Sequence, residues 1–216
     1  MPRLHLISGL AADRSAFDRL GTFTSLPLNY IDWLPNHPEE PLADYAQRLI
    51  KHYQIREDDL LLGLSFGGLV SLEIARILAS PKVILLSSFR DKQDLQPPLY
   101  WSLRLGLHRI IPKYRLRLIN GMLKYQFSAV SEAGRKVLDR MLNQSDLALT
   151  KWSVQKIAET KYRPLAITAV YSLLGDADRM VRTWPHEQLS IIPGGGHFMV
   201  FEQAEAVTAQ LKKILV

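Results

Sequence analysis

The chain has 216 residues, of which 47% are hydrophobic and 22% charged, values typical of one globular domain with a sizeable core. It has a net charge of +6 and no cysteine, which excludes disulfides, thiolate chemistry and zinc sites built on sulfur. The N-terminal segment lacks a signal peptide's apolar core, and no stretch approaches the roughly 18 apolar residues of a membrane span, so we expect a soluble, cytoplasmic protein.

Strand-like and helix-like segments alternate along the chain. Short apolar runs predict strands at residues 4–7, 28–34, 60–64, 82–88, 165–173 and 189–192. Apolar residues at three- and four-residue spacing predict helices at residues 39–54, 66–79 and 202–215. Continuous apolar strands separated by helices are typical of a parallel sheet that is covered on both faces. We therefore predict an α/β fold with a mostly parallel sheet of about six strands flanked by helices.

Between residues 90 and 163 this alternation stops. The segment is rich in Leu, Arg and Lys at helical spacing, and prolines at positions 97, 98 and 112 break it into pieces. We interpret it as a helical insertion that caps one end of the sheet. The predicted organisation is therefore a core made of residues 1–89 and 164–216, with a cap at residues 90–163.

The most apolar of the predicted strands ends in a serine between glycines. Residues 63–67, Gly-Leu-Ser-Phe-Gly, match the pattern G-x-S-x-G, and Gly68 extends it. To present a hydroxyl above the edge of a sheet, the chain must turn from strand into helix at the serine itself, which strains the backbone and requires small neighbours. The helix N-terminus also favours developing negative charge. Ser65 is therefore a candidate nucleophile, and the simpler alternative is a serine that only caps the helix.

A serine nucleophile needs an imidazole to take its proton and a carboxylate to orient that imidazole. After such a strand–turn–helix motif, the chain order is serine, acid, histidine. His197 follows a strand and three glycines and precedes the last helix. Asp176 and Asp178 both follow a strand and precede His197, and Asp91 is a less constrained candidate. The other histidines are placed less suitably: His5, His37, His52, His108 and His186.

These segments together resemble the α/β-hydrolase superfamily, in its branch with a serine nucleophile and a helical cap. The resemblance covers about two thirds of the chain and rests on the N-terminal turn LISGLAADRSAF and on residues 63–68, 175–181 and 194–203. Ser8 stands where the family usually has His, and we expect the sheet to lack the family's first two strands. The helix that normally separates the acid from the histidine is shortened to a stub containing Pro185.

The resemblance implies a role for several residues. Asp178, three residues after Gly175, becomes the triad acid, and Asp176 is the alternative. The backbone N–H groups of Leu10 and Phe66 become the oxyanion hole. The replacement of the family's usual His by Ser8 does not remove either donor, because both donors are backbone groups.

The positive charge is concentrated in the predicted cap. Residues 90–163 contain 15 Lys and Arg against 6 Asp and Glu, an excess of 9. A solvated helix face is the simplest interpretation; a mouth that attracts anionic substrates is the second, and contact of residues 100–121 with a lipid surface is the least favoured. Nucleic-acid binding is not expected, because no recognition motif accompanies the charge.

The sequence therefore predicts a serine hydrolase that cleaves a carboxylic ester or thioester through an acyl-enzyme on Ser65. Because this fold hosts many chemistries, two alternatives stay open: a lyase that uses the same triad, and a small-molecule-binding protein without turnover. The mechanism requires no metal ion or organic cofactor. The expected partner is a small-molecule substrate with an acyl or anionic group, and the substrate's identity and the oligomeric state stay open.

Overall fold

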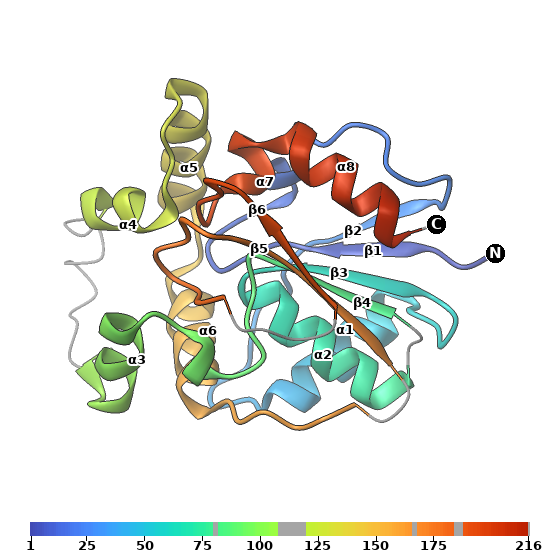
Figure 1. Ribbon diagram of the computed structural model, residues 1–216. Coiled ribbons are helices and arrows are strands. Elements are labelled where there is room, and N and C mark those ends of the chain that lie inside the picture. Colours follow the sequence, from blue (N-terminus) through green and yellow to red (C-terminus); the bar gives the residue numbers. More distant parts are fainter. Residues whose placement is uncertain (80–81, 108–119, 166–167, 184–187, 216) are drawn as a thin grey trace.

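A computed structural model describes residues 1–79, 82–107, 120–165, 168–183 and 188–215 (Figure 1). Six strands form one parallel sheet in the order β2-β1-β3-β4-β5-β6, which confirms the predicted α/β fold. The strands are β1 (Leu4–Ile7), β2 (Leu28–Ile31), β3 (Leu60–Leu64), β4 (Lys82–Leu86), β5 (Ala169–Gly175) and β6 (Leu189–Ile192). The helices are α1 (Leu42–Tyr53), α2 (Phe66–Leu78), α3 (Pro97–Arg104), α4 (Asn120–Phe127), α5 (Glu132–Gln144), α6 (Leu147–Glu159), α7 (Met199–Glu202) and α8 (Ala204–Ile214), with 3-10 turns η1 (Arg14–Phe17) and η2 (Lys92–Asp94).

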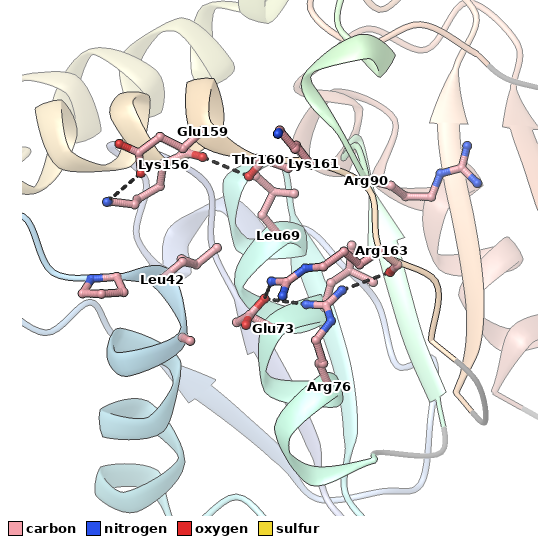
Figure 2. Close-up of a pocket in the computed structure, with 13 residues that line it drawn as sticks. Leu42, Leu69, Glu73, Arg76, Arg90, Lys156, Glu159, Thr160, Lys161 and Arg163 are labelled. Atoms are coloured by element: carbon pink, nitrogen blue, oxygen red, sulfur yellow. Dashed lines mark hydrogen bonds and ion pairs between the residues drawn. The ribbon is translucent and has the colours of Figure 1, made fainter.

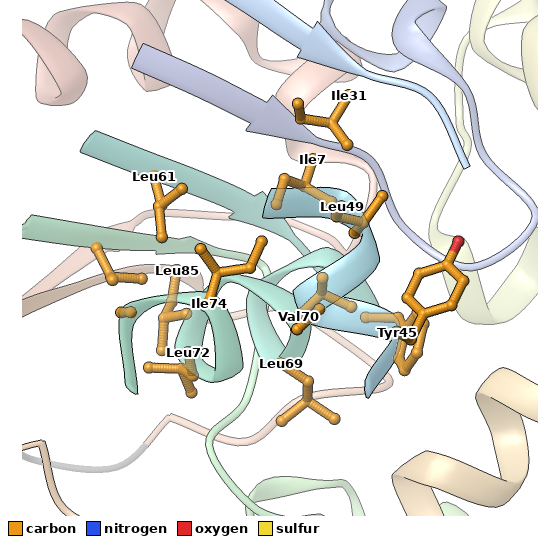
Figure 3. Packing of buried hydrophobic residues seen from close by; sticks show 14 of the residues in the cluster. Ile7, Ile31, Tyr45, Leu49, Leu61, Leu69, Val70, Leu72, Ile74 and Leu85 are labelled. Carbon is orange, nitrogen blue, oxygen red and sulfur yellow. The ribbon is translucent and has the colours of Figure 1, made fainter. Parts of the chain in front are cut away.

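The central strands are buried on both faces because successive side chains point in opposite directions. Leu61 and Leu85 point to one face, where α1 and α2 cover the sheet (Figure 3). Leu62 and Leu86 point to the other face, where Val207 of α8 belongs to the same buried cluster. Because helices cover both faces of the sheet, a ligand can approach the strands only at their two ends.

The order of the strands reverses direction at β1, which lies between β2 and β3. In open α/β sheets, ligands bind beyond the carboxyl ends of the strands at such a reversal. Ile7, the last residue of β1, pairs with both Ile31 of β2 and Gly63 of β3. The turns that follow β1 and β3 therefore emerge side by side at this edge.

Three strands differ in extent from the prediction: β2, β4 and β5. β2 ends at Ile31 because β1 offers only four partners, and the chain then turns so that the Trp33 indole N–H donates to backbone oxygens of the turn after β1. β5 begins at Ala169 and reaches Gly175, whereas apolarity predicted residues 165–173. Its extent follows from its neighbours, because pairing with β4 starts at Ala169 and pairing with β6 ends at Gly175.

Helix boundaries also shift by a few residues. α1 begins only after Pro41, whose extended backbone precedes the helix. The helix predicted at 202–215 is α8, which begins at Ala204; Gln203, with φ −127° and ψ 41°, separates it from the short helix α7. The strand predicted at 82–88 ends at Leu86, since Ser87 has a φ of 43°.

Helices α3 to α6 lie between β4 and β5, within the segment predicted as a cap, and Figure 1 shows them gathered where the strands end. The division into core and cap domains at residues 90 and 163 stays a prediction. Within the described ranges, no helix is both long and apolar enough to cross a membrane. Several positions named in the sequence analysis lie outside those ranges: His108, Pro112, Pro185, His186 and most of the segment 100–121.

Candidate active site

Ser65 occupies a strained turn between β3 and α2. β3 ends at Leu64 and α2 begins at Phe66, so one residue makes the whole change of direction, with φ 51° and ψ −120°. A non-glycine residue in such a conformation costs roughly 1–3 kcal/mol and persists only when its surroundings hold it. They do so here: the Ser65 N–H donates to Leu86 O at 3.0 Å, and Ser88 Oγ donates to Ser65 O at 2.6 Å.

The glycines beside Ser65 are required by close backbone contacts. A Cβ on Gly67 would lie 2.3 Å from the carbonyl oxygens of both Ile7 and Ser8. A Cβ on Gly63 would lie 2.4 Å from the carbonyl oxygen of Gly67. Such distances are far inside van der Waals contact, so α2 can start this close to β1 and β3 only without side chains at these positions.

Ser65, His197 and Asp178 form one continuous hydrogen-bonded chain. His197 Nε2 lies 2.9 Å from Ser65 Oγ, and His197 Nδ1 lies 2.9 Å from Asp178 Oδ2. A carboxylate can only accept, so Nδ1 carries the hydrogen and Nε2 is left to accept from the serine hydroxyl. The imidazole is 2% exposed, and Asp178 Oδ1 also accepts the N–H groups of Met180 and Val181 at 2.7 and 3.0 Å.

The other candidate acids lie elsewhere. Asp176 is exposed, and its Oδ1 accepts the Gly194 N–H at 2.6 Å, which fastens the turn after β6. Asp91 accepts the N–H groups of Gln93 and Tyr162, and so it holds the two ends of the helical insertion together. Of the three carboxylates that the sequence offered, Asp178 is therefore the one that contacts His197.

The turn after β1 is held rigidly beside the serine. Its Ala12 N–H donates to Gly9 O at 3.1 Å, and Ser8 Oγ donates to Ala12 O at 2.8 Å. The Leu10 and Phe66 N–H groups have no hydrogen-bond acceptor among the described residues. An unsatisfied pair of backbone donors beside a serine can bind a developing oxyanion.

Aromatic packing fixes the first residue of α2. The Phe66 ring is fully buried, with ring centroids 5.6 Å from Trp33 and 6.0 Å from Trp152. Tyr45 continues this cluster at 4.6 Å from Trp152, and burial raises the pKa of its hydroxyl, which donates to Leu34 O. The position of Phe66, and with it that of its backbone N–H, is therefore fixed by the packing of its own side chain.

A model of the alpha/beta hydrolase family matches residues 3–210 of this sequence. The chain belongs to the alpha/beta hydrolase family. Among curated protein sequences, none matches it.

Solved structures of hydrolases share the fold of this family member at low sequence identity. A hydrolase from Oleispira antarctica is 13% identical with a TM-score of 0.78, and the match covers 99% of this chain and 90% of that one. A putative aryl esterase from Burkholderia cenocepacia is 16% identical with a TM-score of 0.73, covering 99% and 89%. The RedJ thioesterase of the prodiginine pathway in Streptomyces coelicolor is 17% identical with a TM-score of 0.66, covering 99% and 90%.

In this alpha/beta hydrolase, the loop after β5 that carries Asp178 (residues 176–181, the acid loop) contacts the start of the helical insertion. Gln96 Nε2 donates to Asp178 O at 2.9 Å, and Leu95 forms an antiparallel bridge with Val181. Sequence reasoning missed these contacts, because no motif marks Gln96 and the two segments are more than 80 residues apart. Only their shared edge of the sheet brings them together.

Two further residues lie next to this hydrogen-bonded chain, and no motif predicted their contacts with Ser65 and His197. Phe127, at the end of α4, packs edge-on against His197 with ring centroids 5.3 Å apart, and its carbonyl accepts the Phe198 N–H. Ser88 supports Ser65, as described above, and its position at the end of a buried strand was the one available signal. Within the described residues, no group of three or more His, Asp or Glu side chains could hold a metal ion.

Proposed function

We propose that this alpha/beta hydrolase is a serine hydrolase that cleaves a carboxylic ester or thioester through an acyl-enzyme on Ser65. The observation that carries the proposal is the chain of hydrogen bonds from Ser65 through His197 to Asp178, at 2.9 Å for each link. The strained turn at the serine and the two unsatisfied N–H groups beside it support the same function.

In the first half of the reaction, Ser65 Oγ attacks the substrate carbonyl carbon while His197 Nε2 takes the hydroxyl proton. Asp178 keeps the imidazole oriented and stabilises its positive charge. The carbonyl oxygen becomes negative and accepts from the Leu10 and Phe66 N–H groups, each worth about 3 kcal/mol of barrier lowering. The bond to the leaving oxygen or sulfur then breaks, and His197 returns the proton to that leaving group.

In the second half, water attacks the acyl-enzyme and gives one proton to His197. The tetrahedral intermediate collapses, the bond to Ser65 Oγ breaks, and His197 returns the proton to the serine. The products are the free acid and a restored enzyme. Every proton moves through one imidazole, which explains why its tautomer has to be held by a buried carboxylate.

The walls of the substrate site come from the helical insertion. Among the aromatic residues of this insertion, Trp101 and Tyr125 are 52% and 61% exposed. Phe127 is the one that contacts the triad histidine. We propose that the acyl group passes Phe127 on its way to Ser65, and that the esterase and thioesterase found among the structural neighbours mark the range of leaving groups.

A fluorophosphonate probe followed by peptide mass mapping tests the nucleophile. The folded protein should carry one adduct at Ser65, and Ser65→Ala should lose the adduct and about 1,000-fold or more of its p-nitrophenyl ester turnover. Ser25→Ala, at an exposed serine, is the matched control and should behave as wild type. Absence of an adduct at Ser65 would overturn the proposal. An adduct without turnover in a chain-length series of acyl esters and acyl-CoAs would overturn hydrolysis and favour a lyase or a binding protein.

A further inference from the structure

A cavity of about 500 Å³ lies on the flank of α2, and none of its lining residues belongs to the triad (Figure 2). Its walls come from α2, from the N-terminal end of α1, and from the end of α6 with the chain that follows it. The volume is within the range of about 300–1,000 Å³ that small-molecule sites occupy. The cavity is therefore large enough for a ligand of its own.

The lining of this cavity has an excess of positive charge. It contains two carboxylates, Glu73 and Glu159, and five cationic side chains: Arg76, Arg90, Lys156, Lys161 and Arg163. Four of these five cations belong to the basic segment 90–163, so part of the excess noted in the sequence is gathered here. A concave surface with such an excess attracts and holds anions.

Two guanidinium groups in the lining of the cavity share one carboxylate. Arg76 Nη1 and Arg163 Nη2 both contact Glu73 Oε2, and Arg76 Nη2 donates to Arg163 O at 3.1 Å (Figure 2). One carboxylate thus neutralises one of two guanidinium charges. Adjacent guanidinium groups with remaining N–H donors fit phosphate oxygens in a bidentate manner.

Further cations lie where this cavity meets a second one. Arg90 and Lys161 line both the first cavity and a neighbouring one of about 520 Å³. Arg90 is held in place by Asp94 at 3.5 Å and by the Tyr162 ring at 5.2 Å, whereas Lys161 is exposed and has no ion pair within the described part of the chain. Lys161 is thus available to a ligand that extends from the first cavity into the second.

The remaining wall of the first cavity is apolar and is formed in part by Leu42, Leu69 and Leu72. We propose that the cavity binds a phosphorylated small molecule whose phosphate lies against Arg76 and Arg163 and whose apolar or aromatic portion lies on these leucines. The proposal is independent of the hydrolase function, because it uses none of the residues assigned to catalysis.

Isothermal titration calorimetry with ATP and inorganic pyrophosphate tests this site. Wild type should bind ATP saturably at one site, and pyrophosphate should compete with it. Lys161→Gln combined with Arg163→Gln should weaken ATP binding about 10-fold or more, since it removes two charge-assisted contacts to the phosphate groups. Both side chains are exposed, so the variant should fold.

The matched control is Lys212→Gln combined with Lys213→Gln, which removes the same charge from an exposed part of α8. It should bind ATP within about twofold of wild type, and both variants should keep wild-type ester turnover. No saturable binding of either probe, or equal weakening in the control, would overturn the site. Binding of decanoate without competition by pyrophosphate would overturn phosphate as the ligand class in favour of a carboxylate. Loss of turnover without loss of ATP binding would concern the hydrolase proposal alone.

Discussion

Two buried His–Asp pairs lie at opposite edges of the same sheet. His197 and Asp178 follow β6 and β5 at the carboxyl edge, and their nearest ring nitrogen and carboxylate oxygen are 2.9 Å apart. His5 lies within β1 and Asp59 directly precedes β3 at the amino edge, again at 2.9 Å. Both pairs are almost fully buried, so distance and burial do not separate them.

The two pairs differ in the group that contacts the second ring nitrogen of each histidine. His197 Nε2 faces the hydroxyl of Ser65. At His5 the second ring nitrogen accepts from Asn29 Nδ2 at 3.0 Å, so no reactive group faces the imidazole. The carboxyl edge is also where helices begin with free N–H groups, which favours negative charge there. A His–Asp pair therefore becomes a candidate catalytic pair through its place in the sheet and its third partner.

The amino-edge pair is part of a closed ionic cluster. Asp59 accepts the backbone N–H groups of Arg3 and Arg56 and contacts both guanidinium groups. Burial acts to raise the pKa of Asp59, but the bonds from His5 and these N–H groups outweigh it and hold the pKa well below 3.8. Burial lowers the pKa of His5 and opposes the effect of Asp59, so the imidazole is neutral. This cluster joins β1 to β3 and stabilises the fold.

The largest expected effect tests the carboxyl-edge pair. Asp178→Asn should lower kcat for ester hydrolysis by about 1,000-fold or more, because an amide no longer holds the correct imidazole tautomer. Asp176→Asn is the matched control and should stay within a few fold of wild type, since Asp176 contacts a backbone N–H and not His197. Circular dichroism verifies that both variants fold. The reverse ranking would move the acid role to Asp176.

The second prediction tests the amino-edge pair by stability. Asp59→Asn should lower the free energy of unfolding by about 3 kcal/mol, because the amide loses the buried negative charge and one of the two acceptor oxygens that bind His5 and the backbone N–H groups of Arg3 and Arg56. Asp58→Asn, at an exposed neighbour that pairs with Arg56, should change it by no more than about 0.5 kcal/mol. Urea unfolding measures both. Folded Asp59→Asn should keep its ester turnover; equal stability of the two variants would contradict the structural role.

The smallest expected effect is a pH dependence of stability. Since the pKa of folded His5 lies below the ordinary 6.5, the unfolded chain binds more protons below that pH, and the free energy of unfolding should fall as pH decreases through 6.5. Asp59 adds a further loss at lower pH, because its folded pKa lies below the ordinary 3.8. Urea titrations at decreasing pH measure the slope. A stability that rises on acidification below pH 6.5 would contradict the neutral His5.

The order of helices and strands and the sharp turn at Ser65 could be predicted from the sequence alone, because both depend on local sequence. The apolar runs and helical spacing indicated the alternation of elements, and the glycines around Ser65 indicated the sharp turn. Strand ends were less accessible: β2 stops at Ile31 because its partner stops, and Gly175 belongs to β5 because β6 pairs with it. Such limits are properties of neighbouring strands, which a single segment does not contain.

The sequence by itself determined the fold class and the candidates Ser65 and His197, since a strained turn and a glycine-flanked histidine leave local signatures. Only the tertiary structure shows which carboxylate contacts His197, because Asp176 and Asp178 are two residues apart and differ in the direction in which the loop points their side chains. Only the tertiary structure brought Gln96 to the acid loop and the cations of a distant segment to α2. Hydrogen bonds and charge clusters are short-range in space, and the fold makes neighbours of residues that the sequence separates.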